Sequence, residues 1–516
     1  MNQQSKATSA RDEMIRRDTE RLHALGYAQE LYRAMGGFSN FAISFTIISV
    51  LSGCLTLFGF GLNTAGPAAG AIGWPIVSVM VMFVALSMAE LASAYPTAGG
   101  LYYWASMLGG PGWGWFTGWM NLIGQVAVTA GIDFGLATFV NILMNQWWGM
   151  PQTPGVILIT YAVALALHMG MNILGVRLVA LLNDVSVWWH IAGVAVIAVL
   201  LAVKAPHHSL ALAFRTGYTN SGFPYWYSFL IGLLLAQYTL TGFDASAHMT
   251  EETVGAETRA PWGVVMSVAV SAVAGYVLLM ALLMAIPDLG KTAANGNPVG
   301  YILNSALGAD LGTFLLVVAV IAQFYCGMSS ITANSRMIYA FSRDGAMPLS
   351  SVWHSLHRGV RVPVNAIILG GVCSFLLAVP YLWNAAAYAA VTSIATVGLY
   401  ISYVTPVYLR WRMGAAFKPG VWNLGRWSAP INVVAVVWVV IITVLFMLPT
   451  LTPIDRNNFN YTVVVLGVTV VVLAAWWNLS VRHWFHGPHS QGSLAEMNRI
   501  EQEMGEGPAA PSGVAR

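Results

Sequence analysis

The stretch TLTGFDASAHMTEET, residues 239–253, closes a long apolar run. Gly242 is the first interruption of that run, Asp244 follows two residues later, and a glutamate pair ends the stretch. Glycine weakens a helix by about 1 kcal/mol relative to alanine, and a carboxylate inside a membrane costs about 3 kcal/mol or more. If the surrounding chain lies in lipid, these residues predict an interrupted helix that carries a buried acid.

The composition of the chain indicates a membrane protein. Of its 516 residues 57% are hydrophobic and only 8% are charged, whereas about a quarter are charged in soluble domains. We expect no cleavable secretory signal in the polar residues 1–35, and a disordered tail after Arg482. The three cysteines, odd in number and without metal-ligand spacing, are expected to be core thiols. They are Cys54, Cys326 and Cys373.

Apolar runs of about 20 residues, the length that crosses a bilayer, predict twelve spans. They lie at roughly 40–66, 74–95, 113–142, 155–173, 184–203, 225–250, 262–286, 311–341, 364–380, 386–409, 430–450 and 461–481. With both ends inside, only four of the 23 Lys and Arg residues fall outside: Lys204, Arg215, Lys291 and Arg456. Positive residues favour the cytoplasmic side. We therefore expect a multi-pass protein of the cytoplasmic membrane with both termini in the cytoplasm.

The first and sixth predicted spans both carry a glycine near the middle, in Ser52-Gly53-Cys54 and in Thr241-Gly242-Phe243-Asp244. Glycine also serves close helix packing in membranes. Nevertheless, two interrupted spans five apart are the pattern of inverted five-helix repeats, which bind a substrate between broken helices at the midplane. The expected segments are a cytoplasmic arm 1–35, a first repeat 36–203, an outer loop 204–224, a second repeat 225–410, two further spans within 411–483 and a disordered tail 484–516.

Three stretches resemble amino-acid permeases of the amino acid–polyamine–organocation superfamily. They are SMAELASAYPTAGGLYYWAS (87–106), TGFDASAHMTEETVGAETRAP (241–261) and SSITANSRMIYAFSRDGAMP (329–348). The resemblance covers roughly residues 30–480. The first span and LNDVSVWWHIAGV (182–194) are most similar to the amino acid/choline branch, which includes γ-aminobutyrate, choline and basic amino-acid permeases. The resemblance implies an all-α integral membrane protein of the LeuT type, with discontinuous helices one and six and alternating access.

The resemblance also implies a substrate site at the two interruptions. Backbone N–H groups of the first span would hold a substrate carboxylate, Phe243 would be an aromatic lid, and the glutamates after it would lie at the cytoplasmic rim. Asp244 would either bind a substrate ammonium or lock the unwound segment by accepting backbone N–H bonds. Gln125, like Asn121 and Asp133, lies on span three, in a water-lined vestibule or a polar clamp. The candidate substrate-binding residues are Ser52, Gly53, Cys54, Leu55, Thr56, Gln125, Thr241, Gly242, Phe243 and Asp244.

His190 in the fifth span is a candidate for proton coupling. Proton-coupled members of the superfamily carry a lysine near this position, and imidazole titrates in the physiological pH range. The alternative is a histidine that is hydrogen-bonded between helices. We expect its neighbours to be span one near Ser49–Gly53 and span eight near Ser329, Ser330 and Thr332.

A cytoplasmic gate is expected from charges at the ends of spans one and eight. In transporters of this fold an ion pair closes the inner pathway, and Arg33 with Asp344 lies at such positions. Arg336 with Glu90 could add a second pair. The alternative is that both arginines only anchor the positive inside.

Together these features predict a secondary transporter of a small amino acid such as γ-aminobutyrate, coupled to protons, without an enzymatic activity, cofactor, metal or nucleic-acid partner. Choline, a polyamine or another organic cation is the alternative substrate class, held by Asp244, Phe243 and Trp188 through cation–π contacts. Amino-acid exchange and a transporter-like sensor stay open. An intramembrane enzyme needs a nucleophile–base or metal constellation, which the sequence does not offer. The oligomeric state stays open.

Overall fold

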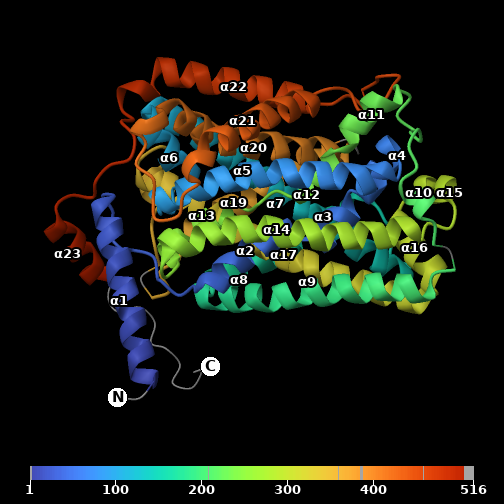
Figure 1. Ribbon diagram of the computed structural model, residues 1–516, viewed down its shortest axis with the longest axis horizontal. Coiled ribbons are helices and arrows are strands. Elements are labelled where there is room, and N and C mark those ends of the chain that lie inside the picture. The colour runs from blue at the N-terminus through green and yellow to red at the C-terminus, as the bar shows by residue number, and fades with distance from the viewer. Residues whose placement is uncertain (1–2, 207, 358, 384–386, 457, 505–516) are drawn as a thin grey trace.

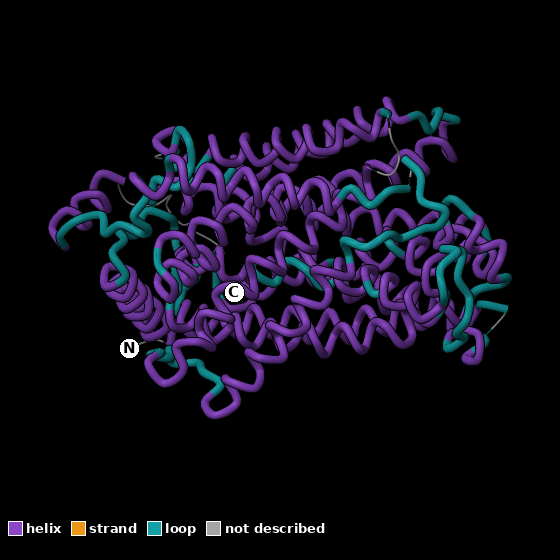
Figure 2. Tube along the Cα trace, turned by 90° about the horizontal axis from the view of Figure 1, so that it is seen from above, coloured by secondary structure: helices purple, strands orange, loops and turns teal. Residues whose placement is uncertain are grey.

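The computed structural model describes residues 3–206, 208–357, 359–383, 387–456 and 458–504. This part of the chain folds into an all-α bundle whose helices run along the long axis (Figure 1). Most loops gather at the two ends of the bundle (Figure 2). Eleven of its helical segments are long and apolar enough to cross a membrane. The prediction of an all-α, multi-span membrane protein is therefore confirmed.

The eleven segments combine adjoining helices where only a short kink divides them. They are α2–α3 (Gly37–Thr56), η1–α5 (Ala69–Ala94), α7 (Pro111–Trp148), α8 (Pro154–Ile173), α9 (Val176–Lys204), α14 (Ala256–Met284), α17 (Ala309–Arg343), α19–η3 (Val364–Leu382), α20–η4 (Ala390–Ala416), η5–α21 (Gly425–Leu445) and α22–η6 (Thr462–His483). Helices outside these segments include α1 (Gln3–Ala24), α6 (Gly100–Gly109), α10 (Leu210–Ala213), α15 (Leu289–Ala294), α16 (Pro298–Leu307), α18 (Ser350–Trp353) and α23 (Leu494–Met504).

The predicted sixth span is missing from the eleven because it is divided into short pieces. These are α11 (Tyr225–Gly232), α12 (Leu234–Thr239), α13 (Ala245–His248) and the 3-10 turn η2 (Thr250–Glu252). Residues 240–244 between α12 and α13 are not helical. The interruption that Gly242 predicts is therefore present, and Gly242 has the positive φ of 105° that glycine tolerates best.

The first span is interrupted too, but one turn earlier than expected. Its pieces are α2 (Gly37–Ile48), α3 (Val50–Thr56) and α4 (Phe58–Ala65), and Ser49 between α2 and α3 has a left-handed backbone with φ 38° and ψ 79°. The expected interruption at Ser52-Gly53-Cys54 is wrong, since these residues lie inside α3. Gly53 serves close packing instead, because a Cβ there would lie 2.6 Å from the Thr239 hydroxyl of α12.

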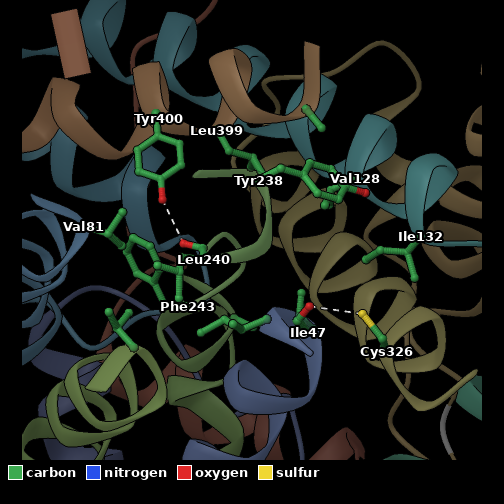
Figure 3. Packing of buried hydrophobic residues seen from close by; sticks show 14 of the residues in the cluster. Ile47, Val81, Val128, Ile132, Tyr238, Leu240, Phe243, Cys326, Leu399 and Tyr400 are labelled. Atoms are coloured by element: carbon green, nitrogen blue, oxygen red, sulfur yellow. Dashed lines mark hydrogen bonds between the residues drawn. The ribbon is translucent and has the colours of Figure 1, made fainter. Parts of the chain in front are cut away.

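The two interrupted segments lie against each other in the middle of the bundle. Helix α3 packs on α12, and α2 packs on α13. A Cβ on Gly242 would lie only 2.3 Å from the side chain of Ile47, so this glycine is needed for contact as well as for its backbone angle. Figure 3 shows Ile47, Leu240 and Phe243 packed together at this place.

The outer helices present apolar surface that water would not cover. Helix α22 lies on one side of the bundle and α9 on the opposite side (Figure 1). On α22 a row of exposed valines includes Val464, Val468, Val471 and Val472. Apolar patches of this kind on a protein surface mark contact with lipid or another protein.

Both described ends of the chain lie at the same end of the bundle, where α1 and α23 meet (Figure 1). His23 of α1 lies 2.7 Å from Glu501 of α23. The expectation of a disordered tail is wrong for Leu494–Met504, which fold as α23; the tail residues 505–516 lie outside the described residues. We call this the arginine end, because Arg33, Arg336 and Arg343 lie there, and the opposite end, with α10 and α15, the loop end.

Candidate functional site

The first interruption is held by a hydrogen bond from Ser49 to His190. The Ser49 hydroxyl lies 2.7 Å from Nε2 of His190, and Nδ1 of His190 lies 2.8 Å from the Ser186 carbonyl oxygen. A carbonyl only accepts, so Nδ1 carries the hydrogen and Nε2 accepts from Ser49. The expected contact with span one is present, and the imidazole is fully hydrogen-bonded as a neutral group.

The expected contacts of His190 with the eighth span are different in the structure. Ser329 donates to Asn183 at 2.6 Å, and Thr332 donates to Asn172 at 2.7 Å. Ser330 lies 2.7 Å from the Thr129 hydroxyl. These α17 residues therefore bind helices α9, α8 and α7 rather than the imidazole.

Some of the backbone N–H groups that were expected to hold a substrate carboxylate already donate hydrogen bonds within the first span. The N–H groups of Ser52 and Gly53 donate to the Ser49 carbonyl oxygen at 2.8 and 2.9 Å. Cys54 and Leu55 are buried inside α3, and Thr56 lies 3.5 Å from the Gln323 amide. The first turn of a helix leaves N–H groups without an intrahelical partner. In α3 this turn begins at Val50, which sequence reasoning missed because it placed the interruption too late.

The carbonyl groups freed at the two interruptions are bound by side chains from other helices. The thiol of Cys326 on α17 donates to the Ile47 carbonyl oxygen at 3.1 Å, and the Tyr400 hydroxyl on α20 donates to the Leu240 carbonyl oxygen at 2.8 Å (Figure 3). Within the second interruption, Thr241 donates back to the Gln237 carbonyl oxygen at 2.7 Å. At least one carbonyl group at each interruption is therefore bound by a side chain from another helix.

Asp244 is fully buried and is bound by side chains from three elements. Oδ2 accepts from Gln125 at 2.7 Å and from Asn121 at 3.4 Å, both on α7. Oδ1 accepts from the Tyr403 hydroxyl of α20 at 2.7 Å, and Nε2 of His248 on α13 lies 3.3 Å from Oδ2. The carboxylate ties the second interruption to α7 and α20 through side chains, rather than through the backbone N–H groups that were expected.

Phe243, the expected aromatic lid, is fully buried in this structure. Its ring centroid lies 4.9 Å from that of Tyr403 and 6.3 Å from that of Tyr400. Sequence reasoning missed both tyrosines, because a tyrosine in an apolar helix cannot be distinguished from an ordinary packing residue by its sequence context. Two tyrosines of α20 thus pack against Phe243 at the second interruption.

The two expected gate pairs are wrong. Arg33 donates to the carbonyl oxygens of Thr250 and Thr253, whereas Asp344 accepts from the hydroxyls of Tyr27 and Tyr102. The signs of the charges alone did not show that backbone carbonyl oxygens would bind Arg33 and that tyrosine hydroxyls would bind Asp344.

The partners of the second expected pair are also different. Glu90 binds Arg410 at 3.1 Å and Ser428 at 2.6 Å. Arg336 binds Glu252 at 2.7 Å. Each member of the expected Arg336–Glu90 pair therefore has another partner of opposite charge.

At the arginine end the glutamate pair of the opening stretch binds two arginines of α17. Arg343 contacts Glu251 through two hydrogen bonds of 2.9 Å, and Arg336 contacts Glu252. All four side chains are buried, so the glutamates do not lie at a water-exposed rim as expected. Burial raises the pKa of Glu251, but Arg343, the Ala98 N–H and the charge of Arg33 together lower it further, and the net pKa lies below the ordinary value of 4.5. Burial raises the pKa of Asp344 despite the opposing charge of Arg343.

At the loop end a cavity of about 350 Å³ lies beside α4. Its polar lining includes Asn63 and Thr64 from α4 and Asn458 and Asn460 from the loop before α22. Buried ion pairs thus join α17 to η2 at the arginine end, and the cavity adjoins α4, the last piece of the first span, at the loop end.

Asp133 forms a polar clamp and does not line a vestibule. Its carboxylate lies 3.0 Å from Nδ1 of His168, and both side chains are fully buried between α7 and α8. In the described residues, no group of three or more His, Cys, Asp or Glu side chains is arranged to hold a metal ion.

Comparison with known proteins identifies similar chains. A family model described as amino acid permease matches residues 35–470. The amino-acid permease BAT1 of Arabidopsis thaliana is 40% identical over 91% of this chain and 96% of its own length. Its homologue in Oryza sativa is 40% identical over 91% and 95%. A putative polyamine transporter of Candida albicans is 25% identical over 97% and 94%.

Proposed function

The chain belongs to the amino acid permease family, and from that premise we propose that it moves a small amino acid such as γ-aminobutyrate by proton-coupled alternating access. Family membership confirms the prediction of a transporter rather than an enzyme. The observation that carries the proposal is the contact of the two interruptions, at Ser49 and Gly242, in the middle of the bundle.

Two interrupted helices supply both kinds of group that a zwitterion needs. The start of α3 offers backbone N–H groups and the positive end of the helix dipole, which suit a carboxylate. The ends of α2 and α12 offer carbonyl oxygens, which suit an ammonium group. A substrate ammonium would compete with Cys326 and Tyr400 for the Ile47 and Leu240 carbonyl oxygens. We place the substrate between these groups, with Phe243 as the covering ring.

The structure supports a state that is closed to the cytoplasm. In this proposal the arginine end is cytoplasmic, because it carries the excess of basic residues, and the loop-end cavity is the remnant of an outer vestibule. Counting α11–α13 as a crossing gives twelve spans, with both termini inside. We further propose inverted repeats at 36–203 and 225–410, followed by two additional spans within 411–483.

The alternative of choline, a polyamine or another organic cation depends on a free carboxylate. Asp244 would supply it, but Gln125, Tyr403 and Asn121 already bind its two oxygens. A substrate cation would have to displace these donors, so the structure favours a zwitterion held by backbone groups. The Arabidopsis and rice relatives carry the name amino-acid permease, which agrees with this choice.

The experiment is a panel of labelled solutes in proteoliposomes made with purified protein. We expect accumulation of at least one small amino acid, with competition by γ-aminobutyrate, and no accumulation of choline or spermidine. A ligand that binds the native state also raises the melting temperature by mass action, so the same panel is ranked by thermal shift. Accumulation of choline or spermidine without any amino acid would overturn the proposed substrate class.

A further inference from the structure

Three buried histidines lie in the membrane-spanning part, and their hydrogen bonds can be counted proton by proton. His190 is complete as a neutral imidazole, because Nδ1 donates to a carbonyl oxygen and Nε2 accepts from the Ser49 hydroxyl. For His168, Nδ1 faces the carboxylate of Asp133 and donates to it, and Nε2 has neither a hydrogen-bond partner nor a facing carboxylate among the described residues. Neither arrangement requires a proton beyond the one that a neutral imidazole carries.

In His248, by contrast, both ring nitrogens face oxygen atoms that accept hydrogen bonds. Its Nδ1 lies 3.1 Å from the carbonyl oxygen of Ala98, which only accepts, so Nδ1 carries a hydrogen. Its Nε2 lies 3.3 Å from Oδ2 of Asp244 and has no hydrogen-bond partner among the described residues. In a neutral imidazole this Nε2 would turn a lone pair toward the oxygen of a carboxylate. Both side chains are fully buried, where such an arrangement is costly.

We propose that His248 and Asp244 together hold one exchangeable proton, and that this pair, not His190, is the proton-binding site of the transporter. The inference rests on the proposed function. Asp244 accepts hydrogen bonds from Gln125 and Tyr403 at 2.7 Å each, which favours an ionised carboxylate. The proton therefore resides on Nε2 of His248 as an N–H bond, and its release leaves the neutral imidazole.

The position of the pair links the proton to the proposed substrate site and to the ion pairs at the arginine end. Asp244 lies at the second interruption, beside the proposed substrate site. Ala98 binds the imidazole through its carbonyl oxygen, and its N–H donates to Glu251 at 2.9 Å. Glu251 in turn binds Arg343 at the closed arginine end. Loss of the proton removes the attraction between His248 and Asp244 and loosens Ala98, which joins this pair to Glu251 and Arg343 at the arginine end.

Other ionisable groups lie on the elements that pack around the pair. Helix α2, which packs on α13, carries none. On the remaining neighbours they are Tyr102 and Tyr103 of α6, Asp133 of α7, Glu257, Arg259 and Tyr276 of α14, Asp310, Tyr325, Cys326, Arg336, Tyr339 and Arg343 of α17, Glu251 and Glu252 of η2, and Tyr400, Tyr403, Tyr408, Arg410 and Arg412 of α20. Of these, Tyr403 alone hydrogen-bonds to Asp244.

The test compares His248→Gln with His190→Gln and with wild type in proteoliposomes. Glutamine keeps a donor for one of the two contacts but cannot be protonated. For His248→Gln we expect loss of accumulation driven by a pH gradient, a smaller loss of counterflow, and an uptake rate that no longer depends on pH. For His190→Gln we expect slower transport in both assays, because the first interruption loses its bond from Ser49, but an uptake rate that still depends on pH. The reverse pattern would overturn the proposal.

A second measurement does not depend on transport. Magic-angle-spinning NMR of protein labelled with ¹⁵N-histidine, in vesicles at pH 7.5, should show a charged imidazolium signal that disappears in His248→Gln. In Asp244→Asn, His248 should become neutral. A neutral His248 in wild type would overturn the inference even if amino acids are transported. An imidazolium in a protein that transports no amino acid would overturn the proposed function alone.

Discussion

Gly242 is the residue on which the second interruption depends. Its φ of 105° lies in a region that other residues rarely adopt, and a Cβ would meet the Ile47 side chain at 2.3 Å. Both constraints can be read from its place in the fold, whereas the sequence shows only that a glycine interrupts an apolar run. The prediction from sequence was correct here because backbone angle and close packing both require the same residue type.

Replacing Gly242 with alanine should cost about 2 kcal/mol of stability from backbone strain and overpacking. We expect uptake to fall by more than about tenfold, since the added Cβ would push the second interruption away from Ile47 at the first. The matched control is Gly467→Ala in α22, where an added Cβ meets nothing within 4 Å. Melting curves and initial uptake rates measure the two effects, and equal behaviour of both variants would contradict this role.

The roles of Ser49 and Tyr403 could not be predicted from their residue types. A left-handed serine carries no sequence signature, since Ser49 owes its φ of 38° to the packing of α2 and α3 and to its bond with His190. Tyr403 looks like any aromatic in an apolar helix until Asp244 is found opposite its hydroxyl. The site residues that sequence reasoning missed are therefore those whose role depends on a partner far away in the chain.

Tyr403→Phe tests the bond to Asp244 without changing the ring. A hydrogen bond to a charged group contributes about 1.5–3 kcal/mol, so we expect a lower melting temperature and slower uptake. Tyr408→Phe on the same helix is the control, because Tyr408 contributes ring contacts with Trp113 and Trp411 that phenylalanine keeps. A Tyr403→Phe protein that melts and transports like the control would show that the bond is dispensable.

At the scale of elements, the order of the helices could be predicted and their pairing could not. Runs of apolar residues locate the spans, and the glycines point to the two interrupted ones. The partners of Arg33, Arg336 and Asp344 could not be predicted, because each had several candidates of opposite charge. Only the fold shows that Arg343 and Arg336 lie opposite the glutamate pair that follows α13.

The buried pair of Glu251 and Arg343 predicts a dependence of stability on pH. The pKa of Glu251 is lower in the folded protein than its ordinary value of 4.5, so the ionised glutamate stabilises the fold at pH values above 4.5. This contribution is lost as the pH falls through the lowered pKa.

Thermal melting of wild type and Glu251→Gln between pH 3.5 and 7.5 measures this effect. We expect wild type to melt at the higher temperature above about pH 5 and the difference to shrink on acidification. Glu257→Gln serves as the control, because Glu257 forms a partly exposed pair with Arg21. A difference that grows as the pH falls would contradict the assignment.

At the scale of the whole molecule, composition alone predicted a membrane protein with many spans. The ordered helix α23 was not predicted, because the tail was judged by its polar composition and not by its contacts. Its order follows from tertiary bonds, such as Glu501 to the His23 ring and to the N–H of Gln29. Contacts between the two ends of a chain of 516 residues cannot be derived from local patterns.

The proposed orientation and closed state predict which positions react with a membrane-impermeant maleimide added from outside. In a protein whose half-buried Cys373 is replaced by serine, Asn63→Cys at the loop-end cavity should be labelled in whole cells. Ser335→Cys, buried at the arginine end, should stay unlabelled. Labelling of Ser335→Cys alone would reverse the orientation, and labelling of both would contradict a closed inner pathway.

The central claim is that the two interrupted helices meet to form the substrate site. The most direct test is a cryo-electron microscopy map of the protein saturated with the amino acid that it accumulates best. We predict ligand density between Ser49 and Gly242, with the carboxylate toward the start of α3 and the chain non-helical at both places. A map in which both helices run continuously through these residues, or in which the ligand binds elsewhere, would contradict it.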